Sequence, residues 1–312
     1  MSSQSINNRL ALTSLRRRWI FAAVLGVQFL IAGFGLLSSS WQIIYALRWL
    51  LLAALILAYM LWTLWRGLEA NHRHGEGRLL PGLGTGNGLT VLRGALIAGA
   101  AGFLFSPWPE GWLRWAPGIL YTLAAIIDLF DGYLARLQNH VTALGERLDM
   151  SLDGLGVMVA TLLVVQYGQV PGWYILVALA RYLFVAAIWL RKRLGKPVYE
   201  LDHSAVRRPF AGAQMGFVAV ALWPVFLPPT THLAATLFAL PFLAGFCRDW
   251  LVVSGALRPA LRETSVVIAQ PADKAKLLKG LLFRLVFHWL PVLLRIGSVS
   301  LLAVGLISTW PA

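Results

Sequence analysis

The sequence predicts an all-α protein that crosses a membrane several times. Of its 312 residues, 58% are hydrophobic and only 13% are charged, and the mean hydropathy is +0.69. Soluble domains are about 25% charged, so this composition excludes a soluble globular fold. Several stretches also have the roughly 20 mainly apolar residues that a membrane-spanning helix needs. The single cysteine, Cys247, excludes an intramolecular disulfide framework.

Two spans are expected before the main block of the chain. They cover about residues 19–37 and 43–65, with the three serines at 38–40 in a tight turn between them. The three arginines at 16–18 before an apolar run are also typical of a signal peptide. No cleavage site follows and the next segment is apolar as well, so we expect a retained helix. The polar, glycine-rich residues 66–88 are expected to form a loop.

A block of six further spans follows this loop. The predicted spans are about 89–106, 116–137, 145–167, 172–190, 210–227 and 232–253. A last apolar region is interrupted by Arg284, His288, Pro291 and Arg295, so it is either a surface helix with a short span or one kinked span. The expected organisation is two N-terminal helices (1–65), a cytoplasmic loop (66–86), a six-helix core (87–255), a basic linker (256–280) and a C-terminal apolar helix (281–312).

The distribution of basic residues predicts the orientation in the membrane. If the spans alternate, most lysines and arginines of the loops fall on one side, and the opposite loops carry only Arg114 and, near an interface, Arg48. The positive-inside rule makes the basic side cytoplasmic. We therefore expect a multi-pass protein of the cell (inner) membrane. The net charge of +14 then follows from topology, and no nucleic-acid partner is expected.

Four aspartates lie at helical spacing between residues 128 and 153. Asp128 and Asp131 are three apart, and Asp149 and Asp153 are four apart, so each pair shares one face of a helix. The two pairs can meet across a helical hairpin on the cytoplasmic side. Acids near hydrocarbon are costly and indicate a functional site. A hard cation such as Mg²⁺ or Mn²⁺ would relieve their repulsion, and two such ions could clamp a phosphate.

The residues between the two pairs suit a phosphate ligand. Gly132 and Gly145 allow close approach of a ligand to the backbone. Arg136 can bind phosphate through two hydrogen bonds, and Thr142 can donate one from its hydroxyl. One alternative is that the acids form structural salt bridges with Arg136 and Arg147. Another is a cation transporter, but transporter acids tend to be scattered over several helices, whereas these are clustered in one hairpin.

The motif resembles a known family. The chain carries the pattern Asp128-x2-Asp131-Gly132-x2-Ala135-Arg136-x8-Gly145-x3-Asp149-x3-Asp153, which is similar at every fixed position to the signature of the CDP-alcohol phosphotransferases. The resemblance covers about residues 87–255 and includes Asn87-Gly-Leu-Thr90-Val-Leu-Arg93. It implies an integral-membrane transferase that displaces CMP from CDP-diacylglycerol with the hydroxyl of a small alcohol. It also implies a divalent metal and a homodimer. An inactive scaffold is disfavoured because no signature position is lost.

The resemblance also implies a role for each motif residue. Asp128, Asp131 and Asp149 would be metal ligands, and Asp153 would be both a ligand and the general base for the acceptor hydroxyl. Two Mg²⁺ or Mn²⁺ ions are expected. The residues expected to bind the CDP-lipid are Asn87, Thr90, Arg93, Gly132, Arg136, Thr142 and Gly145.

The acceptor is predicted from arginines on the later spans. Arg181 lies inside a span, where a charge is expensive, so it is either a ligand or a structural pair. Arg191, Arg207 and Arg208 lie at cytoplasmic ends and either bind the acceptor or reflect topology alone. A basic pocket suits a phosphorylated alcohol.

The chain looks most like the phosphatidylglycerophosphate synthases, so glycerol 3-phosphate is favoured. Those enzymes usually have an acid where Tyr182 stands and a Lys-x-Lys-Thr run where 207–209 stand, so inositol phosphate stays a rival. Arg248 and Asp249 are expected to form only a local pair at the interface.

Overall fold

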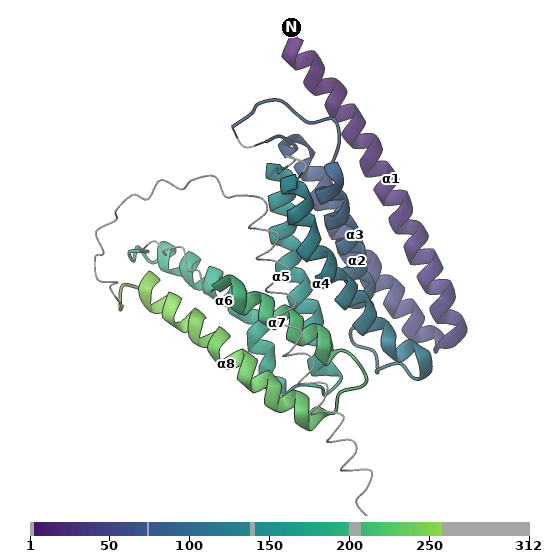
Figure 1. The fold of residues 1–312 in the computed structure, drawn as a ribbon, viewed down its shortest axis with the longest axis vertical. Helices are drawn as coiled ribbons and strands as arrows, with labels where there is room; N and C mark the ends of the chain where they lie inside the picture. The colour runs from purple at the N-terminus through teal and green to yellow at the C-terminus, as the bar shows by residue number, and fades with distance from the viewer. Residues whose placement is uncertain (1–2, 74, 138–140, 200–206, 258–312) are drawn as a thin grey trace, which may run out of the picture.

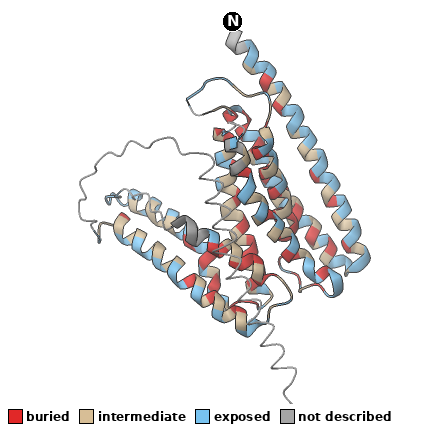
Figure 2. Cartoon of the chain, in the orientation of Figure 1, coloured by how far each residue is buried: buried red, intermediate tan, exposed pale blue. Residues whose placement is uncertain are grey.

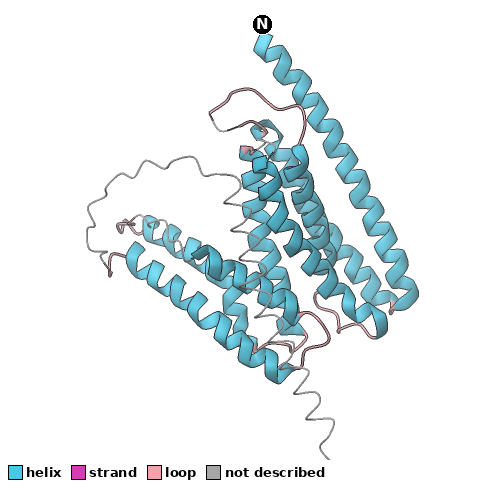
Figure 3. Ribbon diagram, in the orientation of Figure 1, coloured by secondary structure: helices cyan, strands magenta, loops and turns pink. Residues whose placement is uncertain are grey.

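The structure, a computed structural model of the chain, describes residues 3–73, 75–137, 141–199 and 207–257. These residues form eight α-helices joined by turns and three short 3₁₀ segments (Figure 1, Figure 3). The α-helices are α1 (Ser3–Ser40), α2 (Ile43–Gly67), α3 (Gly84–Ala101), α4 (Ala116–Leu137), α5 (Ala143–Gln166), α6 (Ile175–Arg193), α7 (Arg207–Ala221) and α8 (Pro228–Val253). The 3₁₀ segments are η1 (Leu68–Ala70), η2 (Gly111–Trp115) and η3 (Gly172–Tyr174).

Within these residues, six helical stretches are long and apolar enough to cross a membrane, which confirms the all-α polytopic fold. They cover most or all of α1, α2, α4, α5, α6 and α8. The other two helices differ from the spans predicted for them. The 18-residue α3 begins with polar and glycine residues, and the 15 residues of α7 extend only about 22 Å, less than the roughly 30 Å of hydrocarbon.

The polar α3 is tolerated because other helices surround it. It contacts α1, α2, α4 and α5, so its buried Asn87, Thr90 and Arg93 face protein. Charged side chains within a membrane normally face the interior of a helix bundle in this way. Figure 2 shows the contrast with α1, which is exposed along most of its length. The central helix of the bundle is thus one that hydropathy describes poorly.

The N-terminal helix is longer than the sequence predicted. It has 38 residues and continues through the three serines, which were expected to form a turn. The hydroxyls of Ser38 and Ser39 donate to the carbonyl oxygens of Gly35 and Leu36, at 3.0 and 2.9 Å. Serine hydroxyls that bond back to the preceding turn remain compatible with a helix. The chain reverses only after Ser40, before α2.

The two N-terminal helices pack tightly on the core through Trp49 of α2. This side chain is 2% exposed, and its Nε1 donates to the carbonyl oxygen of Gly99 in α3 at 2.8 Å. A Cβ atom added at Gly33 or at Gly102 would lie 2.3 Å from the Trp49 ring. Because only glycine leaves room for the indole at both places, α1, α2 and α3 are held in one packed unit.

The loop between η1 and α3 is shorter than predicted, because α2 extends to residue 67 and α3 begins at residue 84. Asn71 is fully buried within it, and its Nδ2 donates to the carbonyl oxygens of Leu80 and Gly82 at 3.0 and 2.8 Å. Asn8 of α1 accepts a hydrogen bond from the Leu79 N–H at 3.1 Å. The loop is therefore tied both to itself and to the start of α1.

The last three described helices form a second group. In Figure 1, α6, α7 and α8 are inclined to the direction of α1–α5, and they contact the first group through α4 and α5. The predicted C-terminal helix (281–312) and almost all of the predicted basic linker lie outside the described residues.

Candidate active site

The two aspartate pairs meet between α4 and α5, as their spacing predicts. One carboxylate oxygen from each of Asp128, Asp131 and Asp149 can be chosen so that all three lie within 4.8 Å of one another. Asp131 is 5% exposed, whereas Asp128 and Asp149 are partly open. An all-carboxylate donor set is the kind that hard divalent cations prefer, so these residues fit Mg²⁺ or Mn²⁺.

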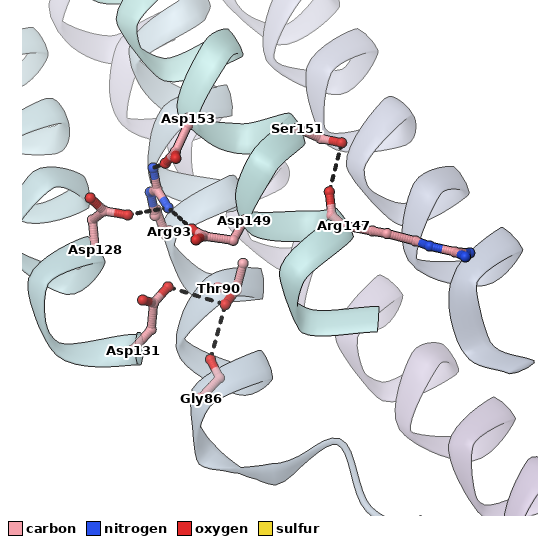
Figure 4. Close-up of polar contacts among 9 residues, drawn as sticks. All are labelled: Gly86, Thr90, Arg93, Asp128, Asp131, Arg147, Asp149, Ser151 and Asp153. Atoms are coloured by element: carbon pink, nitrogen blue, oxygen red, sulfur yellow. Dashed lines mark hydrogen bonds and ion pairs between the residues drawn. The ribbon is translucent and has the colours of Figure 1, made fainter. Parts of the chain in front are cut away.

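Arg93 of α3 lies at the centre of this carboxylate cluster (Figure 4). Its side chain is 1% exposed, and its guanidinium forms ion pairs with Asp128, Asp149 and Asp153. The Nη1–Oδ1 distance to Asp149 is 2.8 Å. The arginine was expected beside a substrate phosphate. In this structure it joins α3 to α4 and α5 through the carboxylates of those two helices. Arg147, the alternative salt-bridge partner, points away from the cluster (Figure 4).

Thr90 of α3 orients the most buried carboxylate. Its hydroxyl oxygen lies 3.1 Å from Asp131 Oδ2 and 3.0 Å from the carbonyl oxygen of Gly86, one turn earlier in the helix. Figure 4 shows this bridge between the helix backbone and Asp131. Because Thr90 is itself buried, the hydrogen bond limits the orientations that the Asp131 carboxylate can take.

The start of α5 is held by a group of buried polar side chains. Thr142 is the N-cap of this helix, and its Oγ accepts hydrogen bonds from the Gly145 N–H and from Asn87 Nδ2, both at 3.1 Å. A Cβ atom added at Gly145 would lie 2.4 Å from Asn87 Oδ1. The glycine was expected to admit a ligand, and here it admits the side chain of Asn87. These contacts set the position of the helix that carries Asp149 and Asp153.

A cavity of about 330 Å³ opens beside Asp153. Most of its lining is apolar, and the polar or charged residues in the lining are Asp153, Arg181, Tyr182, Gln214, Arg248 and Asp249. A Cβ atom added at Gly154 would lie 3.6 Å from Arg181 Nη1, which places this guanidinium over α5 next to Asp153. The structure therefore brings Arg181, predicted as an acceptor residue, to the predicted general base.

The other predicted acceptor residues are placed differently. Arg191 donates from Nε to the carbonyl oxygen of Pro197 at 2.9 Å and from Nη2 to that of Ser254 at 2.6 Å. It thereby ties the end of α6 to the end of α8, and it is not among the cavity residues. Arg207 and Arg208 are the first residues of α7, and their side chains lie outside the described part of the chain. Gly132 and Arg136 lie on α4, and their surroundings are outside the described part of the chain.

Four polar cavity residues were not predicted as site residues: Tyr182, Gln214, Arg248 and Asp249. Arg248 and Asp249 of α8 were expected to form a local pair, yet both line the cavity with Asp153. Gln214 of α7 is 1% exposed, and its Oε1 accepts from the Tyr174 hydroxyl at 2.7 Å. Its Nε2 is buried with no hydrogen-bond partner among the described residues. Their places at the cavity depend on how α6, α7 and α8 face α5, which no spacing along the chain encodes.

A model of the CDP-alcohol phosphatidyltransferase family matches residues 84–246, which is more than half of the chain. The chain belongs to this family. The match begins at the first residue of α3 and ends within α8, close to the core predicted at 87–255. CDP-alcohol phosphatidyltransferases depend on a divalent metal, in agreement with the aspartate cluster. The N-terminal helices α1 and α2 lie outside the match.

Curated relatives cover part of the chain. The CDP-diacylglycerol–glycerol-3-phosphate 3-phosphatidyltransferase of Cereibacter sphaeroides is 34% identical over 43% of this chain and 61% of its own length. The protein of the same name from Escherichia coli K12 is 32% identical over 37% and 64%. A Mycobacterium tuberculosis protein whose name proposes a cardiolipin synthase is 29% identical over 44% and 63%. The chain thus spans less than two thirds of each relative. No solved structure matches it.

Proposed function

We propose that this chain transfers a phosphatidyl group from CDP-diacylglycerol to a small phosphorylated alcohol, with glycerol 3-phosphate as the favoured acceptor. The observation that carries the proposal is the meeting of the family's four aspartates beside a cavity that also contains Arg181. The acceptor oxygen would form a new bond to the β-phosphorus of the donor. The bond from that phosphorus to the CMP oxygen would break, and the acceptor proton would pass to Asp153.

The aspartates would hold the metal, with two Mg²⁺ or Mn²⁺ ions on Asp128, Asp131, Asp149 and Asp153. The ions would supply positive charge against the diphosphate and the leaving CMP. Arg93 already offsets one of the four negative charges through its ion pairs with Asp128, Asp149 and Asp153. It would therefore share the neutralisation of these carboxylates with the metal. The residues proposed to form the CDP-lipid site are Asn87, Thr90, Arg93, Gly132, Arg136, Thr142 and Gly145. Of these, Arg93 would act through the carboxylates with which it pairs, and Gly145 through the Asn87 side chain that it admits.

The acceptor would occupy the cavity beside Asp153. The Arg181 guanidinium suits a phosphate, and the buried Nε2 of Gln214 is a further donor at the same cavity. Arg207 and Arg208 are proposed to add positive charge at the start of α7. Arg191 stays a proposed contributor, although the two carbonyl oxygens that it already contacts favour a structural role. Inositol phosphate is the rival acceptor of this type.

A second acceptor class is favoured by the apolar part of the cavity. Phe184, Phe242 and Phe246 are among its lining residues, and glycerol 3-phosphate has no hydrocarbon chain to place against them. An alcohol that carries acyl chains, such as phosphatidylglycerol, would use this surface. The mycobacterial relative named for cardiolipin synthesis is consistent with this alternative.

The active site is proposed to face the cytoplasm of a cell with the protein in its inner membrane. The support is the expectation from the sequence that the basic loops gather on the cytoplasmic side. A homodimer is proposed from the family resemblance. The proposed function is tested with purified protein, labelled CDP-diacylglycerol, Mg²⁺ or Mn²⁺, and the acceptors glycerol 3-phosphate, inositol phosphate and phosphatidylglycerol. We expect metal-dependent CMP release with one of them. Absence of CMP release with every acceptor would contradict the proposal.

A further inference from the structure

A tryptophan-lined groove lies between α1 and α2, outside the residues that match the family. It has a volume of about 520 Å³ and is lined by Trp19, Ala58, Leu61, Trp62 and Trp65. The Trp19 ring is fixed because its Nε1 donates to the carbonyl oxygen of Leu61 at 2.8 Å. The rings of Trp19 and Trp65 also meet edge to face, 4.9 Å between centroids. The groove therefore has a defined aromatic wall.

Trp19 and Trp65 lie at nearly the same distance from the turn that joins the antiparallel helices α1 and α2, and this distance places the groove near a membrane–water interface. Trp19 lies 21 residues before the end of α1 at Ser40, and Trp65 lies 22 residues after the start of α2 at Ile43. At 1.5 Å per residue, each separation is about 32 Å, close to the roughly 30 Å thickness of bilayer hydrocarbon. Tryptophan is enriched at this depth because its ring is apolar and its N–H is polar.

Two arginines are held at the tryptophans of this groove. The Arg16 guanidinium lies 5.6 Å from the centroid of the Trp65 ring, and that of Arg66 lies 5.4 Å from the centroid of the Trp62 ring. Both arginines are exposed. Neither forms an ion pair with a carboxylate in the described part of the chain. The groove thus combines an apolar floor with positive charge at its interfacial end.

We propose that this groove binds an anionic phospholipid of the surrounding bilayer. One acyl chain would lie against Trp19, Ala58 and Leu61, and the headgroup phosphate would lie between Arg16 and Arg66. An anionic phospholipid has hydrocarbon chains toward the membrane interior and a negative headgroup toward water. The groove has the matching arrangement, with an apolar floor toward the interior and two arginines at the interface. A zwitterionic lipid would fill the same floor but bring no net charge to the arginines. The site is independent of the proposed transfer reaction.

The test compares the lipid preference of full-length variants by native mass spectrometry. The protein is equilibrated in detergent with equal amounts of phosphatidylglycerol and phosphatidylcholine that carry the same acyl chains. We expect the parent to retain phosphatidylglycerol preferentially. Changing Arg16→Gln and Arg66→Gln together should lower this preference roughly tenfold or more, since each interfacial arginine attracts anionic lipid. The matched control, Arg9→Gln with Arg17→Gln, removes two exposed arginines from α1. Of these four arginines, only Arg16 and Arg66 lie over tryptophans of the groove, so the control should change the preference less than about twofold if the lipid is bound at this site.

A third variant tests the groove without changing any charge. Ala58→Phe places a ring in the groove and should also lower phosphatidylglycerol retention, with both arginines intact. Equal loss in the two arginine pairs would overturn the proposal in favour of a diffuse basic surface. A parent without lipid preference would overturn it as well. So would an Ala58→Phe variant that keeps its lipid but changes oligomeric state, because the groove would then be an interface between copies.

Discussion

The position of Arg93 leads to a prediction about stability and metal binding. Arg93→Met keeps a similar apolar stem but removes the charge that pairs with Asp128, Asp149 and Asp153. Removing one partner from a buried ion pair costs about 3–5 kcal/mol. Asp149 and Asp153 are 47% and 41% exposed, so water screens part of the charge left behind. We therefore expect the free energy of unfolding without metal to fall by about 3 kcal/mol.

The same substitution should strengthen metal binding, because the cluster loses its internal positive charge. A unit positive charge about 4 Å from a bound cation repels it by at most roughly 4 kcal/mol near a protein surface. Removing even part of this repulsion predicts at least about tenfold tighter Mn²⁺ binding. Equilibrium unfolding in mixed micelles and Mn²⁺ titration measure the two effects. Arg147→Met is the matched control, since that side chain points away from the carboxylates, and it should change stability by less than about 0.5 kcal/mol.

Two results would refute this reasoning. An Arg93→Met protein as stable as the parent would mean that the three ion pairs do not hold the helices together. A fall in Mn²⁺ affinity as large as that caused by Asp128→Asn would mean that Arg93 assembles the ligands and does not merely compete with the metal for them. Circular dichroism of both variants at low temperature shows whether each has folded before titration.

Three further predictions concern the reaction and the start of α5. Asp153→Asn should abolish CMP release while the affinity for CDP-lipid stays within about threefold, since general-base help is commonly worth roughly 10²–10⁴-fold in rate. Near-normal turnover of this variant would show that Asp153 is not the general base. Arg181→Ala should raise the acceptor KM about tenfold or more and the CDP-lipid KM less than twofold, whereas equal changes in steady-state kinetics would indicate a structural role. Gly145→Ala should destabilise the protein by about 1–3 kcal/mol in the same unfolding assay, because the added Cβ meets Asn87 Oδ1 at 2.4 Å, and Ala143→Gly on the same turn is the comparison for backbone effects.

Several features could be predicted because they are local. The membrane class follows from composition, and the pairing of the aspartates follows from helical spacing. The predicted span at residues 116–137 has the same bounds as α4. Errors arose where hydropathy alone was decisive. It placed a turn at the serines that end α1, and it put the start of the central α3 inside a loop because that segment is rich in glycine and polar residues.

The carboxylate motif that suits a divalent metal was determined by the sequence itself, since residues three or four apart on a helix must share a face. Only the tertiary structure decided what surrounds that motif. Arg93 is 35 residues from Asp128, and its place among the carboxylates depends on the rotation of α3 against α4 and α5. The same is true of Asn87 against Gly145 and of Arg248 in the same cavity as Asp153. Contacts between helices distant in sequence depend on packing, and no spacing along the chain encodes them.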